Sequence, residues 1–215
     1  MSLLPLDPDQ LLSTTRAVRK RLDFSREVPK DLVRECVAMA LQAPTGSNVL
    51  TTQFVVVTDE DKRREVGRIY GEVYAGYRAS AGYPGKLTEG AAETADTRTR
   101  MRVASSADFL GEHMGEAPVL VLSCSVGPNR DAAKAATGNV LPATWSFMLA
   151  ARARGLGTAW TSMHLSREKD VADVLGIPFD TVAQAVLTPL AFTKGTDFKP
   201  ADRPEPDAVI HWDQW

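Results

Sequence analysis

Three apolar runs, separated by longer stretches with helical spacing, constrain most strongly what this chain can fold into. Residues 53–58 hold Phe54-Val55-Val56-Val57, and the other runs cover residues 119–126 and 182–192. Runs of this length and composition are typical of buried strands. A few strands among long helices predict a layered α+β or α/β domain.

The stretches between these runs show the apolar spacing and the end signals of helices. Asp59 is expected to cap one helix and Ser166 another, and Pro44 and Gly46 end a third. Residues 155–163 predict a turn followed by a strand. The helices are expected at residues 11–20, 28–44, 59–77, about 91–115, 141–154 and 166–176.

The chain of 215 residues is long enough to bury a sizeable core, and residues 1–215 are predicted to form one domain. Hydrophobic residues are 44% and charged residues 24%, as in soluble globular proteins. The formal net charge of −2 provides no general basic field, so nucleic acid is not an expected partner. No apolar stretch reaches the roughly 18 residues that a membrane helix needs.

The two cysteines and the first ten residues of the sequence indicate the cellular compartment. Cys36 and Cys124 stand in apolar runs and match neither a CxxC pair nor a zinc spacing, so buried, reduced thiols are expected. The first ten residues carry no basic region of the kind that opens a signal peptide. A cytoplasmic location is therefore expected.

Several familiar motifs are missing from the sequence. No Walker A motif occurs, and Gly155-Leu156-Gly157 fails as a dinucleotide fingerprint because Trp160 takes the place of the third glycine. The three histidines share no metal-ligand spacing, so no metal site is expected. There is no Gly-x-Ser-x-Gly nucleophile elbow either.

A basic segment near the N-terminus is the first candidate for ligand binding. Arg16 and Arg19 lie three positions apart, so on a helical turn they would share a face. Two guanidinium groups on one face can hold a phosphate through paired hydrogen bonds. The alternative is a solvated basic helix end, which the two residues by themselves favour.

Two further segments combine small residues with turns. Pro44-Thr45-Gly46-Ser47-Asn48 follows a helix and precedes a strand, where small residues let the backbone approach a flat ligand. Residues 152–163 pass from a helix through glycines into a strand, and strand residues beyond such a turn often face a pocket. Taken alone, an ordinary Pro-Gly turn and a simple helix-to-strand connection explain these segments better.

The last residues, 193–215, form a polar, proline-punctuated tail. Val209, Ile210, Trp212 and Trp215 are apolar residues in a segment that cannot bury them locally. A tail packed over a partner subunit is one explanation, and packing over the same chain is the other.

Together these segments resemble four blocks of the FMN-dependent nitroreductase family, also called nitro/flavin reductases. The blocks read Thr15-Arg16-Ala17-Val18-Arg19, then Ala43-Pro44-Thr45-Gly46-Ser47-Asn48, then Gly155-Leu156-Gly157 with Trp160 after it, and finally a late basic residue, Arg203. Each block is short, but their order and spacing over residues 14–215 make the resemblance fairly specific.

The resemblance implies an FMN site built from residues far apart in the sequence. The three arginines would hold the phosphate, Ala17 would contribute backbone, and the Pro44–Asn48 loop would line the isoalloxazine ring from the neighbouring subunit. Thr161 and Ser162 would lie near the reactive edge of the flavin, and Asn139 would make a contact across the dimer. The implied FMN-binding residues are Arg16, Ala17, Arg19, Pro44, Thr45, Gly46, Ser47, Asn48, Asn139, Thr161, Ser162 and Arg203.

The resemblance also implies a fold and an assembly. The family has a mixed, mainly antiparallel sheet flanked by helices, and its intertwined homodimers hold two FMN sites at the interface. A variable lid would cover about residues 70–115, and the tail at about 193–215 would wrap around the partner. Tyr74, Tyr77 and Tyr83 near the lid could shape the substrate pocket, although core or surface positions explain them equally well.

The implied activity is that of an oxidoreductase carrying electrons from NAD(P)H through FMN to a small-molecule acceptor. The acceptor would be a nitroaromatic, a quinone or an enone, in a ping-pong mechanism with one shared pocket. Leu50 stands where many members have glutamine. Two alternatives therefore stay open: a specialised FMN-dependent dehydrogenase, dehalogenase or oxidase on the same fold, and a non-enzymatic FMN-binding protein.

Overall fold

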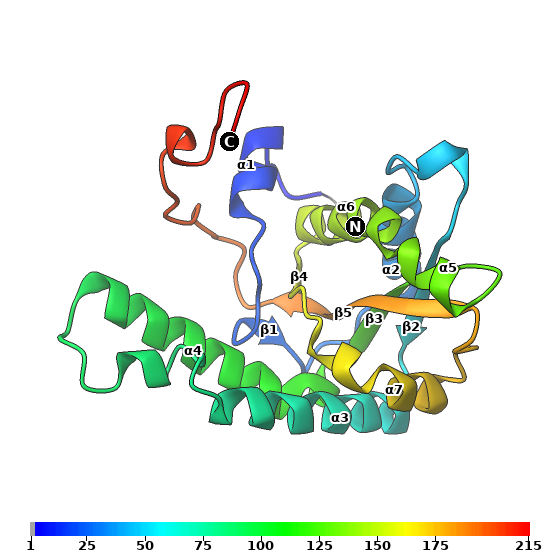
Figure 1. Ribbon diagram of the computed structural model, residues 1–215, viewed down its shortest axis with the longest axis horizontal. Helices are drawn as coiled ribbons and strands as arrows, with labels where there is room; N and C mark the ends of the chain where they lie inside the picture. The colour runs from blue at the N-terminus through cyan, green and yellow to red at the C-terminus, as the bar shows by residue number, and fades with distance from the viewer. Residues whose placement is uncertain (1–2) are drawn as a thin grey trace.

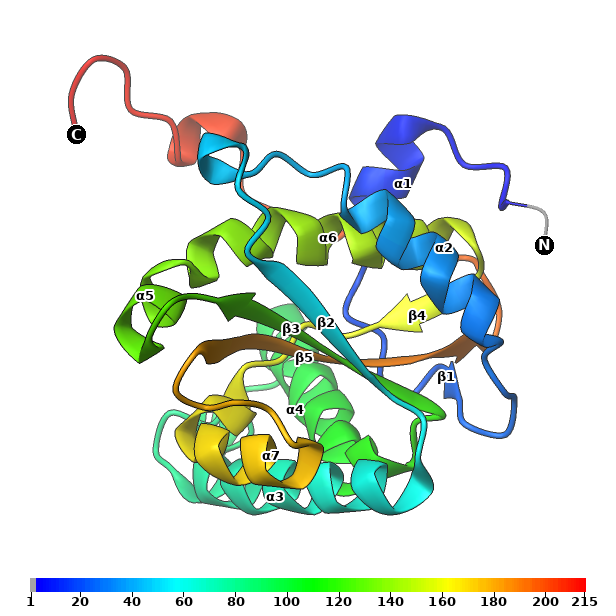
Figure 2. The ribbon, with the colours of Figure 1, turned by 90° about the vertical axis from the view of Figure 1, so that its right-hand side faces the viewer.

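The computed structural model describes residues 3–215 and has three layers, a central sheet with helices on both faces (Figure 1). The helices are α1 (Pro8–Thr14), α2 (Lys30–Ala40), α3 (Glu60–Ala79), α4 (Ala95–His113), α5 (Arg130–Ala135), α6 (Thr137–Ala153) and α7 (Glu168–Leu175). The strands are β1 (Leu22–Asp23), β2 (Thr52–Val57), β3 (Val119–Val126), β4 (Leu156–Thr158) and β5 (Val182–Thr193). Figure 2 shows α2 and α6 on one face of the sheet and α3, α4 and α7 on the other, which confirms the predicted α+β class.

The sheet is built around β5. Its strand order is β1-β5-β3-β2, and β4 also pairs with β5. All of these strand pairs are antiparallel, whereas a single bridge between Ala17 and Thr158 is parallel. The sheet is therefore mixed and mainly antiparallel, as predicted. Strand β2 pairs only with β3 among the described residues and forms one edge.

Strand β3 separates two hydrophobic cores. Leu120 and Leu122 belong to the core that includes residues of α3, α4 and α7, and Val119 and Val121 belong to the core with α2 and α6. Successive side chains of a strand point to opposite faces of the sheet. A strand covered on both faces must therefore be apolar at nearly every position, which explains the uninterrupted run seen in the sequence.

Each cysteine is buried in one of these cores, and the two are not bonded to each other. Cys36 lies in the core formed by α2 and α6, and Cys124 lies in the other core. Burial raises the pKa of the Cys36 thiol to about 11 and that of Cys124 to about 12. Both residues therefore stay protonated and pack as small apolar side chains.

The N-terminal helix differs from its prediction. It begins at Pro8 rather than residue 11, because Asp7 and Gln10 form a reciprocal capping box around its first turn. It ends at Thr14, and the amide of Val18 then donates to the carbonyl of Thr158, at 2.7 Å. The predicted helix at residues 11–20 is therefore wrong beyond Thr14, since the chain adopts an extended conformation there and pairs with β4.

The helix near residue 166 also starts differently. Residues Met163–Arg167 form a 3₁₀ helix, and α7 begins at Glu168 without a side-chain cap. The Ser166 hydroxyl donates to the Met163 carbonyl, at 3.1 Å, so the predicted cap is wrong. Asp59, in contrast, caps α3 as predicted, because its carboxylate accepts from the Lys62 amide at 2.9 Å.

The C-terminal tail leaves the sheet after β5 and extends on the same side as α2 and α6 (Figures 1 and 2). It contains one 3₁₀ turn, Pro206–Ala208. Trp212 and Trp215 are 79% and 99% exposed, and Val209 is also exposed. Within residues 3–215, none of the helices has both the length and the apolar character needed to cross a bilayer.

Candidate functional site

A hollow of about 460 Å³ brings together residues from both ends of the chain. Arg16 and Ala17 come from the extended segment after α1, and Arg203 comes from the tail. Trp145 of α6 and Trp160 beyond β4 also line it, each 37% exposed. We call this hollow the Arg16–Arg203 pocket; its other lining residues are Leu12, Ser13, Thr15, Met148, Pro200 and Ala201.

The extended backbone after α1 places Arg16 at this pocket. Val18 is buried in a small core with Leu22 and Ala191, while Ala17 bridges to Thr158. Arg16 and Ala17 themselves are exposed, and both line the pocket. The Arg16 Nη1 atom donates to the carbonyl of Lys199, at 2.9 Å, so the arginine also holds the beginning of the tail.

The charges of Arg16 and Arg203 are not neutralised locally. Neither guanidinium lies within 4.0 Å of a carboxylate in residues 3–215; Arg203 Nη1 makes only a long contact of 3.5 Å with the Asp202 carbonyl. Two unpaired guanidinium groups beside an aromatic wall suit a ligand that carries both a phosphate and a flat ring. The donor set therefore fits FMN.

Arg19 lies in a second hollow, of about 430 Å³, that shares Arg16 and Ala17 with the first. Lys20, Arg21 and Lys199 add further positive charge there, and Asp197 is the acidic residue of the lining. The helical-face argument for Arg16 and Arg19 is wrong because this segment is extended, but both arginines still line adjoining hollows of one basic region.

The loop that begins at Pro44 lies apart from the Arg16–Arg203 pocket in this chain. It contains the 3₁₀ turn Gly46–Asn48, in which Ser47 and Asn48 have left-handed backbone angles (φ 53° and 56°). These angles are uncommon for residues other than glycine and often mark functional loops. Pro44, Gly46, Ser47 and Asn48 are exposed, and Thr45 is half-buried.

Asn139 lies beside this loop within the same chain. A Cβ atom placed on Gly46 would stand 3.5 Å from the Asn139 side-chain oxygen. The structure therefore brings Asn139 and Gly46 together. The predicted contact of Asn139 across a dimer stays a prediction.

Thr161 is hydrogen-bonded to strand β5 of the sheet. Its hydroxyl donates to the Leu187 carbonyl at 2.6 Å, and its backbone pairs with Leu187 in both directions. Ser162 follows it and is exposed. Thr161 thus fixes the end of this segment against β5, whereas the Ser162 side chain can reach solvent or a ligand.

The two glycines of the third block allow a turn and a close approach of the backbone. Gly155 has φ +75°, a conformation that glycine adopts without strain. A Cβ atom on Gly157 would stand 2.7 Å from Thr193 Cγ2 and 2.9 Å from Leu22 Cδ2. The two glycines therefore make the turn and let β4 approach its neighbours. The residue of this block that lines the Arg16–Arg203 pocket is Trp160, for which the sequence predicted no role.

The three tyrosines pack between α3 and α4. Tyr74 and Tyr83 are buried, and both hydroxyls donate to Asp108 Oδ1, at 2.9 and 2.6 Å. Tyr77 is half-buried with its ring edge-on to Tyr83. Burial, then hydrogen bonding to Asp108, raises the pKa of Tyr74 and of Tyr83, so both stay protonated donors. Their role in a substrate pocket stays a prediction.

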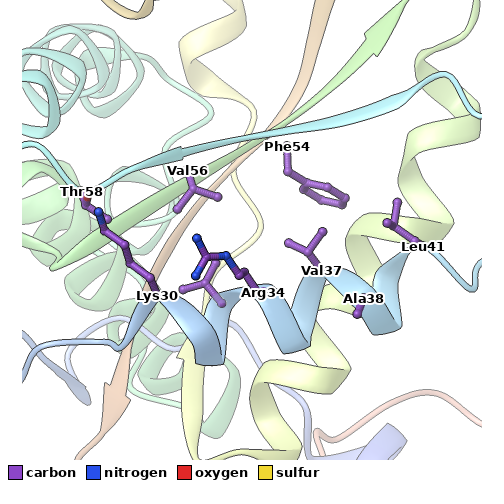
Figure 3. Close-up of a pocket in the computed structure, with 9 residues that line it drawn as sticks. Lys30, Arg34, Val37, Ala38, Leu41, Phe54, Val56 and Thr58 are labelled. Atoms are coloured by element: carbon purple, nitrogen blue, oxygen red, sulfur yellow. The ribbon is translucent and has the colours of Figure 1, made fainter.

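A third hollow, of about 470 Å³, lies between α2 and the edge strand β2 (Figure 3). Figure 3 shows Phe54 of β2 pointing toward Val37 of α2, with Lys30 and Arg34 near one end. None of the predicted site residues lines it. Across residues 3–215, no group of three or more His, Cys, Asp or Glu side chains is placed to hold a metal ion.

Comparison with known proteins shows the family to which the chain belongs. The family model described as the nitroreductase family matches residues 12–190. The chain therefore belongs to the nitroreductase family, which confirms the resemblance at the level of the family; the first three blocks lie within the matched region. Arg203 and the tail lie beyond the matched region. A search of curated proteins gave no match.

Solved structures share the fold at low sequence identity. Iodotyrosine deiodinase bound to FMN and 3-iodo-L-tyrosine is 18% identical, with a TM-score of 0.66 over 95% of this chain and 98% of that one. Nitroreductase A from Vibrio parahaemolyticus is 15% identical, with a TM-score of 0.66 over 96% and 75%. A BluB-like flavoprotein from Clostridium difficile is 14% identical, with a TM-score of 0.66 over 96% and 99%.

Proposed function

We propose that the protein is an FMN-dependent oxidoreductase that takes electrons from NAD(P)H and passes them to a small-molecule acceptor. The observation that carries this proposal is the Arg16–Arg203 pocket, where two unpaired arginines meet an aromatic wall. The FMN named with iodotyrosine deiodinase adds support from a structural neighbour. A nitroaromatic, a quinone or an enone is the proposed class of acceptor.

The residues of the pocket bind and orient the cofactor. Arg16 and Arg203 hold the phosphate, and the bond from Arg16 to the Lys199 carbonyl keeps the tail in reach of it. Ala17 adds backbone, and Arg19 extends the positive potential along the adjoining hollow. When bound, FMN would supply the hydride chemistry of the reaction, which the side chains of the pocket do not provide.

Two tryptophans and the remaining predicted residues would face the flavin ring. Trp145 and Trp160 restrict water at one wall of the pocket. Ser162 would lie near the reactive edge of the flavin, on a segment that Thr161 fixes to β5. We propose that the Pro44–Asn48 loop and Asn139 reach the ring of the neighbouring subunit, since they lie apart from this chain's own pocket.

A homodimer is part of this proposal. The tail exposes Val209, Ile210, Trp212 and Trp215, and such apolar side chains are commonly covered in an assembly. A second copy of the chain would cover them and would add the loop residues to each pocket. Interfaces of this obligate kind bury about 2,000–5,000 Å².

Leu50 supports a second candidate function. It is exposed beside the Pro44–Asn48 loop, where many family members have glutamine. A specialised FMN enzyme, such as a dehalogenase or dehydrogenase, would use a different polar edge around the flavin. A visible flavin spectrum that neither NADH nor NADPH bleaches under anaerobic conditions would favour this candidate or a non-enzymatic FMN-binding protein.

The direct test combines cofactor affinity with reduction. Arg16→Ala and Arg203→Ala are each expected to raise the Kd for FMN about 10- to 100-fold, since each removes a charge-assisted contact to phosphate. Flavin fluorescence titration measures the Kd, and anaerobic NADH or NADPH should bleach the wild-type flavin. Arg34→Ala is the matched control, because Arg34 pairs with Asp31 on α2 away from the pocket. Unchanged affinity in both pocket variants would refute the assignment.

A further inference from the structure

Arg152 carries a buried charge that the site described above does not use. It lies near the end of α6 with only 3% of its surface exposed. No carboxylate lies within 4.0 Å of it in residues 3–215, and its Nε and Nη1 atoms have no hydrogen-bond partner there. Burying a charged group without a counter-ion costs free energy, and the few contacts that Arg152 makes offset part of that cost.

Those contacts are made with the first residues of the tail. Arg152 Nη2 donates to the Thr196 carbonyl, at 2.9 Å, and to the Thr14 hydroxyl, at 3.3 Å. Its guanidinium carbon also lies 4.9 Å from the centre of the Phe198 ring. Arg152 therefore joins the end of α1 to the segment that follows β5.

Arg21 holds the same segment from another side. Its guanidinium donates to the carbonyls of Lys194 and Asp197, at 3.0 and 3.1 Å, and to the Asp197 carboxylate, at 2.8 Å. It also lies 4.1 Å from the centre of the Phe198 ring. Both guanidinium groups therefore contact the same aromatic ring. We call Arg21, Arg152 and Phe198 the tail clamp.

The turn inside the clamp has little freedom. Gly195 has φ +79°, and a Cβ atom there would stand 2.9 Å from Arg21 Nη2. The backbone of this turn therefore closes tightly around the arginine. The next residue of the chain after Phe198 is Lys199.

The clamp leads straight to the Arg16–Arg203 pocket. Lys199, the next residue after Phe198, gives its carbonyl to Arg16, and Pro200, Ala201 and Arg203 line the pocket. We infer that Arg152 is a positioning residue, which with Arg21 and Phe198 aims the tail so that Arg203 meets the same phosphate as Arg16. The inference rests on the proposed function, because it assumes that this pocket takes the FMN phosphate.

The test replaces Arg152 by methionine, which keeps the apolar stem and removes the donors. Arg152→Met is expected to raise the Kd for FMN about tenfold, as for the loss of one charged hydrogen-bonding contact. Trypsin should also cleave the cofactor-free variant faster after Lys194, which Gly195 follows, because this segment of the tail is no longer held. Thermal stability should not fall in parallel, since methionine removes an unpaired buried charge.

A double-mutant cycle separates positioning from a general structural effect. If Arg152 acts through Arg203, Arg152→Met should change the Kd less than about twofold in the Arg203→Ala background. Arg154→Met is the matched control on the same helix end, because Arg154 pairs with Glu35 and does not contact the tail. It should leave both the Kd and the cleavage rate unchanged.

Phe198→Leu is the second variant, for use if Arg152→Met fails to fold. It removes the ring that both cations share and should loosen the same segment. The inference is overturned if the folded variant keeps wild-type affinity and cleavage, or if its effect persists in full without Arg203. Failure of the wild type to bind FMN would instead refute the proposed function, and the cleavage experiment would still test the clamp.

Discussion

His164 shows how a single side chain couples folding to pH. It lies in the 3₁₀ helix before α7 and is completely buried, and neither ring nitrogen has a hydrogen-bond partner among residues 3–215. Burial lowers the pKa of His164 from 6.5 to about 4, because the charged ring is poorly solvated there. The folded protein therefore keeps this ring neutral at a pH where the unfolded chain binds a proton.

The free energy of unfolding should consequently fall as the pH falls from 6.5 toward 4. At pH 5 the linkage amounts to about 2 kcal/mol relative to pH 7. Urea denaturation of the wild type and of His164→Leu at both pH values measures it, and the variant should lose most of this dependence. His211→Gln, in the exposed tail, is the control. An equally steep pH dependence in His164→Leu would contradict the argument.

At the same scale, the sequence identified the cations of the candidate pocket but not its walls. Arg16 and Arg203 line one pocket, and their contact with a phosphate stays a prediction, whereas Trp145 and Trp160 were not predicted to line the site. An isolated tryptophan carries no spacing signal, because its role depends on which distant segment faces it. The glycines beside Trp160 gave a signal for a turn and a close approach, and these are the roles they have.

At the scale of elements, the connection between α3 and α4 depends on Asp108. Its carboxylate accepts hydrogen bonds from Tyr74 of α3 and from Tyr83 of the connection, and Arg78 lies 3.4 Å away. Residues 80–94 contain several glycines and few other buried side chains. The bond from Tyr83 is therefore a main attachment of this segment to the core.

Tyr83→Phe should loosen that attachment without unfolding the protein. Loss of one hydrogen bond, at about 1 kcal/mol, should speed amide exchange of residues 80–94 about fivefold. Hydrogen–deuterium exchange read by mass spectrometry resolves this segment. Tyr77→Phe is the matched control, because the Tyr77 hydroxyl has no hydrogen-bond partner in the described chain. Exchange that is equal in the two variants would show that Tyr83 is not the attachment.

Periodicity predicted the long elements well and the short ones poorly. Strand β3 has the predicted bounds because its apolar run is long and uninterrupted. Helix α3 begins after the predicted cap, and its many residues follow one helical repeat. Strand β1 has two residues and offers no repeat to detect. The start of α1 was detectable, since Asp7 and Gln10 frame a capping box with Pro8 in the first turn.

At the scale of the whole molecule, we expect the C-terminal tail to form the contacts that hold the homodimer together. Deleting residues 205–215 keeps Arg203 but removes the exposed Val209, Ile210, Trp212 and Trp215. We expect the truncated chain to sediment as a monomer at micromolar concentration, where the full chain sediments as a dimer. Leu3→Ser, at an exposed apolar position near the other terminus, is the control. A truncated chain that stays dimeric would place the interface elsewhere.

The two buried thiols can report how often each layer of the molecule opens. Cys36 and Cys124 lie in separate cores on opposite faces of the sheet. A thiol reagent dissolved in the surrounding water can react with either one only after its own layer opens. The labelling rate of each cysteine therefore measures how often its own layer opens. Equal rates would indicate that the two layers open together, and different rates that they open independently.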